Sequence, residues 1–200
     1  MRKCWILSAG LLLAACGSAG DDVPSVRMTV EAAPAITRPV ESSVKTIAPM
    51  SDQALAKIAE IRVILDRNSL PRLARLADAE PAFVSNFAGE ANRTHWDLLR
   101  RTGFDPLDQL ATLLDGPYRA RAVGDEVWYI WPDFAAMESR ELLPERLSFS
   151  DRARILALVG ETGIERIRAG QGYPGIRTAI AEDGRWLYFV HEAEDETGEN

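Results

Sequence analysis

The chain has 200 residues, a hydrophobic fraction of 46% and a formal net charge of −7. That length and composition predict one globular domain with a core of ordinary size. The negative charge disfavours nucleic acid and anionic lipid headgroups as partners, because both repel an acidic surface.

The amino terminus has the pattern of an export signal. Arg2 and Lys3 are basic, and an uncharged run of 11 residues, WILSAGLLLAA, extends from Trp5 to Ala15. A run of this length is typical of a signal peptide, whereas a membrane-spanning helix needs about 20 apolar residues. We therefore expect residues 1–15 to be removed, leaving 21 basic and 30 acidic side chains and a net charge of −9.

The run ends in Leu13-Ala14-Ala15-Cys16, which resembles the bacterial lipobox. The resemblance implies that Cys16 becomes the first residue of the mature protein and carries a lipid anchor that includes palmitate-type acyl chains. Ordinary cleavage that leaves Cys16 as a free thiol is the alternative. Because Cys4 is lost with the signal, the mature chain keeps one cysteine and cannot form an internal disulfide. A lone cysteine at the new terminus is better explained as an attachment point.

The lipobox predicts a location in the bacterial cell envelope. Neither Gly17 nor Ser18 is acidic, which in a cell with two membranes favours the outer membrane facing the periplasm. Residues 16–50 are rich in small side chains and punctuated by prolines, so we expect a disordered tether. At the other end, residues 192–200 carry five acids in nine positions, and a disordered acidic tail is expected. These assignments leave residues 51–191 for the domain.

The first half of the domain has helical periodicity. Ser51 is placed to cap a helix that runs to about Arg67, and a second helix is expected after Ser69 with Pro71 in its first turn. The first helix carries apolar side chains at steps of three and four, namely Leu55, Ile58, Ile61 and Leu65.

Three shorter elements are expected next. Residues 82–87 predict a short strand, and Asn92 or Thr94 can cap a helix that runs through Arg101. Asp105-Pro106 has the pattern of a helix start. The expected core positions of that helix are Leu107, Leu110, Leu113 and Leu114.

The second half turns toward β structure. Residues 126–131 (EVWYIW) predict a strand with apolar groups on both faces, and Ser148 or Ser150 can cap a helix over 151–159, followed by a short helix over 160–168. Residues 176–191 predict a β-hairpin that turns at 182–184. The fold class is therefore predicted as α+β, with helices packed on a small antiparallel sheet that ends in a hairpin.

Several of these segments together resemble a family of uncharacterised bacterial proteins. The segments are Asn86-Phe87-Ala88-Gly89, His95-Trp96, Tyr129-Ile130-Trp131-Pro132, Gly175-Ile176-Arg177 and residues 183–190. Members of that family carry a YVWP-like element and a terminal hairpin of the form GYR…DGxWxYFV. The likeness covers about residues 70–191, with Ala88 in place of a second glycine and His191 in place of a small residue. It implies a domain boundary and brings no activity with it.

Few residues have the spacing of catalytic or metal sites. The chain has two histidines, His95 and His191, and no paired His or Cys motif, so neither a metal nor another cofactor is expected. His95, beside Trp96 at a helix start, is the candidate general base, and its alternative is a structural histidine. Glu126 and Asp133 flank the aromatic strand and are the candidate acids of a glycosidase, with turn and cap charges as their alternative.

The aromatic side chains suggest a binding surface. Trp128, Tyr129, Trp131 and Trp186 are the candidates, and burial in the core is their alternative. The leading hypothesis is a membrane-anchored envelope lipoprotein that binds an envelope protein or glycan without catalysis. The alternative is an envelope hydrolase that acts on peptidoglycan or an ester through His95 and a nearby acid, and a structural spacer is a third possibility.

Overall fold

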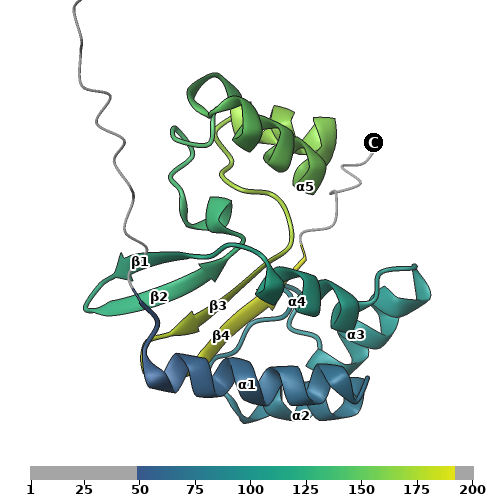
Figure 1. The fold of residues 1–200 in the computed structure, drawn as a ribbon. Coiled ribbons are helices and arrows are strands. Elements are labelled where there is room, and N and C mark those ends of the chain that lie inside the picture. The colour runs from purple at the N-terminus through teal and green to yellow at the C-terminus, as the bar shows by residue number, and fades with distance from the viewer. Residues whose placement is uncertain (1–48, 192–200) are drawn as a thin grey trace, which may run out of the picture. The chain divides into compact units, whose positions relative to one another are not determined.

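A computed structural model describes residues 49–191, which form an α+β fold of α-helices and an antiparallel sheet (Figure 1). The predicted signal, Cys16, the tether up to residue 48 and the acidic segment 192–200 lie outside the described residues. The elements are α1 (Asp52–Asp66), α2 (Leu70–Ala79), α3 (Asn92–Arg101), α4 (Pro106–Asp115), β1 (Arg119–Val123), β2 (Glu126–Trp131), the short 3-10 helices η1 (Asp133–Ala136) and η2 (Pro144–Arg146), α5 (Phe149–Arg168), β3 (Arg177–Ala181) and β4 (Trp186–Val190).

Side-chain caps start three of the helices where the sequence predicted them. The Ser51 hydroxyl accepts a hydrogen bond from the Ala54 N–H at 3.1 Å, and the Asp105 carboxylate accepts one from the Leu107 N–H at 2.9 Å. The third cap is Ser148, which starts α5. Helix α1 differs from the prediction at one core position, since Leu55 is 50% exposed and the preceding Ala54 is buried instead.

The predicted caps of α3 are wrong. The helix begins one residue after Ala91, whose side chain cannot cap. Asn92 already lies inside the helix, and its amide nitrogen donates to the Asp78 carboxylate at 2.8 Å. The side chain that the sequence assigned to a cap therefore joins α3 to α2.

The strand predicted over residues 82–87 is also wrong. Val84 alone pairs with Tyr188, in an isolated parallel bridge, and Ala82 adopts a φ of 59° that interrupts an extended chain.

The sequence did not predict strand β1. Its sequence, RARAV, has little strand preference of its own, and it is extended because it pairs along its length with β2, from Arg119 opposite Ile130 to Val123 opposite Glu126.

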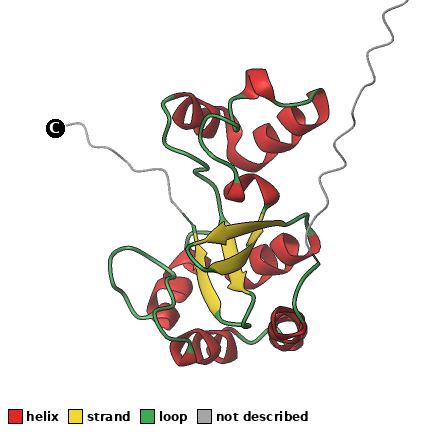
Figure 2. Cartoon of the chain, turned by 90° about the vertical axis from the view of Figure 1, so that its left-hand side faces the viewer, coloured by secondary structure: helices red, strands yellow, loops and turns green. Residues whose placement is uncertain are grey.

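The sheet is a meander in the order β1-β2-β3-β4, and the long segment that holds α5 joins its two middle strands. Helices α1 and α2 lie on one side of the sheet and α5 lies on the other (Figures 1 and 2). The predicted break near residue 160 is present as a kink in α5, where Gly160 has φ 65° and ψ −177°. That backbone conformation is essentially restricted to glycine.

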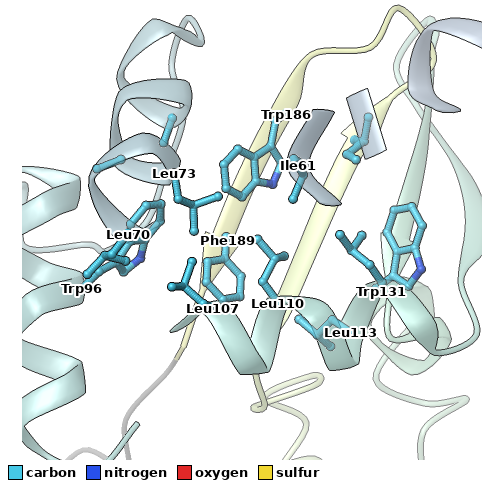
Figure 3. Packing of buried hydrophobic residues seen from close by; sticks show 14 of the residues in the cluster. Ile61, Leu70, Leu73, Trp96, Leu107, Leu110, Leu113, Trp131, Trp186 and Phe189 are labelled. Atoms are coloured by element: carbon cyan, nitrogen blue, oxygen red, sulfur yellow. The ribbon is translucent and has the colours of Figure 1, made fainter. Parts of the chain in front are cut away.

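One face of the sheet, here called the inner face, packs on α1–α4 (Figure 3). Alternate residues of β2 point into this core, and Ile180 of β3 meets them. The buried residues from the sheet are Tyr129, Trp131, Ile180, Trp186 and Phe189, and those from the helices include Ile61, Leu70, Leu73, Trp96, Leu107, Leu110 and Leu113. The opposite or outer face holds a smaller cluster in which Ile130 and Ala179 pack against η1.

A hydrogen-bonded pair sits inside the inner-face core. The Trp186 indole N–H donates to the Thr178 hydroxyl at 2.9 Å, and that hydroxyl donates to the Tyr188 carbonyl at 2.7 Å. Both side chains are fully buried. The pairing register shifts here, because Ile180 is opposite Trp186 while Ala179 is opposite Tyr188, which leaves Leu187 as a bulge.

Replacing Thr178 with Val should destabilise the domain by about 1–3 kcal/mol, because the shape is kept while the buried indole N–H loses its acceptor. The measurement is the free energy of urea-induced unfolding. Thr112→Val is the matched control, since the Thr112 hydroxyl bonds to the Asp108 carbonyl on an exposed helix surface. If both variants lose equal stability, the buried hydrogen bond does not contribute as described.

Candidate functional site

The structure places most of the predicted aromatic surface in the core. Tyr129, Trp131 and Trp186 are 4%, 1% and 0% exposed, so the prediction that they form a binding surface is wrong. They point to the inner face, where the helices cover them. Trp128 is the exception, since it lies on the outer face and is half-buried.

Trp128 has an aromatic partner on the outer face. Its ring meets the ring of Tyr188 edge to face at a centroid distance of 6.4 Å. The Trp128 indole N–H donates to the Glu126 carboxylate at 3.1 Å, which fixes the orientation of the ring. Strands β2 and β4 therefore each contribute one half-buried aromatic side chain to the outer face.

Two arginines lie near this aromatic pair. Burial raises the pKa of Tyr188 to about 12, and the positive charges of Arg177 and Arg121 oppose that rise. The Arg177 guanidinium donates to the carbonyl oxygens of Tyr173 and Gly175, each at 3.3 Å. The Arg121 guanidinium donates to the Ala136 carbonyl at 3.5 Å. Both cations are thus held by backbone oxygens.

A hollow of about 210 Å³ adjoins Tyr188 and Arg177. Its other walls are Val84, Val190 and Phe87, and Phe87 is 75% exposed. The name outer-face patch is used below for Trp128, Tyr188, Phe87, Arg121 and Arg177. Sequence reasoning missed the last four because the side of the sheet that stays open is decided by the packing of the helices.

His95 has one of the two contacts that a catalytic histidine needs, namely a neighbouring acid. Its Nδ1 lies 3.5 Å from the Glu90 carboxylate, so an acid does stand beside the histidine. Its Nε2 is buried and has no hydrogen-bond partner. Among the described residues, no serine or threonine hydroxyl bonds to either ring nitrogen, and activation of a nucleophile requires that contact.

His191 is electrostatically coupled to His95. Burial, together with the charge of His95, lowers the pKa of His191 below its usual value. Its ring packs on Phe104 at a centroid distance of 4.2 Å, and its buried Nδ1 has no hydrogen-bond partner. The neutral form of His191 is therefore favoured at neutral pH.

The two candidate acids are engaged in ion pairs. Asp133 accepts a hydrogen bond from the Arg154 guanidinium at 2.7 Å, and Glu126 pairs with Arg185 of the final hairpin. The Arg154 guanidinium also lies over the Phe134 ring, 4.6 Å from its centroid. These contacts favour the interpretation of both acids as structural charges.

A second cavity, of about 420 Å³, opens beside α5. It is lined by Phe104, Gln109, Leu158, Val159, Thr162, Gly163, Arg166, Pro174, Gly175, Ile176 and His191. No sequence pattern indicated this cavity, because its walls come from four separate segments.

Within residues 49–191, no group of three His, Cys, Asp or Glu side chains is arranged to hold a metal ion. No helix in the same range is long and apolar enough to cross a membrane.

No family model, curated protein or solved structure matches the chain. The likeness to the YVWP-containing family therefore stays a prediction.

The lowered pKa of His191, caused first by burial and then by His95, predicts a pH dependence of stability. Because its pKa is lower in the folded state, the unfolded chain binds the proton more readily, and the stability falls as pH decreases below about 6.5. His191→Gln should reduce the loss of unfolding free energy between about pH 7.5 and pH 5.5. The free energy of unfolding of the parent and of His191→Gln, measured in urea at both pH values, tests this prediction.

The titration itself can be followed by NMR, because the chain has two histidines and His95→Gln assigns the two imidazole signals. If His191→Gln and the parent lose equal stability when the pH is lowered, His191 is not the cause of the pH dependence.

Proposed function

We propose that this protein is a lipoprotein of the bacterial cell envelope, anchored through Cys16, whose domain binds another envelope component without catalysis. In a cell with two membranes, the outer membrane facing the periplasm is the favoured location. The outer-face patch is the observation that carries the binding proposal.

The chemistry of the patch favours an anionic glycan as the component bound. Trp128, Tyr188 and the exposed Phe87 offer aromatic faces and edges on which sugar rings can pack. Arg121 adds a guanidinium group, and such groups suit carboxylates because the two planar groups match.

The hydrolase alternative rests on the pair His95–Glu90. The pair resembles a base and the acid that orients it, but it lacks a bonded nucleophile, and the candidate acids Glu126 and Asp133 are ion-paired with arginines. The binding proposal therefore has the stronger support.

The lipid anchor has a direct test. Mass spectrometry of the amino-terminal peptide of the protein isolated from its own cells should show acyl chains on Cys16 and the loss of residues 1–15. Cys16→Ala should abolish acylation entirely, because the acceptor thiol is gone. Cys4→Ala is the matched control and should leave acylation unchanged, since Cys4 lies within the removed segment. Acylation that persists in Cys16→Ala would contradict the proposal.

The binding surface is tested by sedimentation with purified peptidoglycan sacculi. Trp128→Ala should weaken co-sedimentation by about tenfold or more, as expected for an aromatic anchor worth more than about 1.4 kcal/mol. Leu98→Ala is the control, because Leu98 is 50% exposed on α3, outside the patch. Equal binding by Trp128→Ala and the parent would exclude the patch. If sacculi do not bind while an envelope protein is captured through Trp128, the partner is a protein.

A further inference from the structure

The first half of α5 exposes an apolar stripe to solvent. Phe149 is 86% exposed and Leu156 is 40% exposed, and the small side chains of Ala153 and Ala157 are exposed with them. Counted from Phe149, the other three residues are at i+4, i+7 and i+8, which are positions of one helix face. The name α5 stripe is used below for these four residues.

The other side of α5 already has its own core. Its buried residues Ile155, Ile164 and Ile167 pack into a cluster with Phe134, Leu142, Leu147 and Tyr173. The kink at Gly160 ends the straight part of the helix that carries the α5 stripe. The helix is therefore apolar on two sides, and within residues 49–191 only one of them is covered.

The chemistry of the α5 stripe favours an apolar partner. Its four side chains carry no formal charge and no hydrogen-bond donor or acceptor. A glycan or an acidic peptide laid on it would lose hydrogen bonds to water without gaining replacements. Hydrocarbon loses none, and the removal of exposed phenylalanine and leucine side chains from water is favourable.

The segment before residue 49 indicates which apolar partner is close by. Cys16 is the proposed site of the lipid, and residues 17–48 span at most about 115 Å even when fully extended. The domain of an anchored chain therefore stays near one bilayer, and its contact with that bilayer is intramolecular, at a high effective concentration. A stripe with two large apolar side chains is too small to hold a free protein on a membrane, but it can hold an anchored one.

We propose that the α5 stripe docks on the membrane that holds the lipid anchor. Phe149 and Leu156 then lie at the boundary between the headgroups and the acyl chains. This inference rests on the proposed function, because it requires the anchor at Cys16. The stripe carries no charge, so docking does not need anionic lipids, which an acidic chain disfavours. Docking gives the domain a fixed orientation at the membrane, which a lipid anchor alone does not.

The test is the depth of a probe on α5 in the acylated mature protein, reconstituted in vesicles of phosphatidylcholine and phosphatidylethanolamine. Because Cys4 is removed and the Cys16 thiol carries lipid, Ala153→Cys supplies one free thiol for a fluorescent label. This label should lose most of its quenching by aqueous iodide and gain quenching by phosphatidylcholine that carries a nitroxide on its acyl chain. Ala56→Cys is the matched control, since Ala56 is an exposed alanine of α1, on the other side of the sheet (Figure 1). Its label should stay accessible to iodide.

Charged variants identify the contact. In the chain labelled at residue 153, Leu156→Asp should shift the equilibrium toward the undocked state by about tenfold or more, because the carboxylate would lose its hydration at the membrane. Leu55→Asp makes the same change on α1, where Leu55 is 50% exposed, and should leave docking unchanged. Phe149→Asp is a second variant in case Leu156→Asp fails to fold by circular dichroism, because Phe149 is 86% exposed. Equal docking by the α5 and α1 variants would exclude the stripe as the contact.

Each outcome decides the proposal. If the protein stays with the vesicles while the labels at residues 153 and 56 are equally accessible to iodide, the anchor is kept and the docking is overturned. Loss of iodide quenching without quenching by the nitroxide lipid means that another protein molecule covers the stripe, and this also overturns the proposal. A mature chain without acyl chains removes the anchor and the docking together. Mass spectrometry of the same sample therefore separates a failure of the proposed function from a failure of the docking.

Discussion

The burial of Trp186 is the constraint on which the rest of the structure depends. Its ring lies 4.5 Å from Phe83 and 6.3 Å from Trp96, measured between centroids, so it joins the sheet to the helices. A buried indole N–H needs an acceptor, and the Thr178 hydroxyl provides it. The same hydroxyl donates to the Tyr188 carbonyl, next to the bulge at Leu187. The bulge in turn allows Trp186 and Phe189 both to face the core while Tyr188 faces outward.

The covering of the inner face determines where the protein can bind other molecules. Helices α1–α4 bury that face, whereas the segment between β2 and β3 covers only part of the outer face. Trp128 and Tyr188 therefore stay half-buried beside two arginines. Because α5 packs into a cluster of its own, it leaves a cleft instead of a continuous core. The outer-face patch thus arises at a place where one layer of packing ends.

The proposed binding surface suits an extended ligand. The outer-face patch is shallow and aromatic, and an extended polymer can lie across it.

The sequence by itself determined what depends on neighbouring residues. The serine and aspartate caps, the leucine spacing of α4, the break at Gly160 and the hairpin over 176–191 were all predicted, because a cap, a period or a turn is complete within a few positions. Tertiary structure alone decided the rest. It made β1 a strand by pairing, reduced residues 82–87 to a single bridge, and buried Tyr129, Trp131 and Trp186 while leaving Trp128 half-buried. Strand EVWYIW is apolar on both faces, so only the elements packed against each face decide which side chains become core and which remain available for binding.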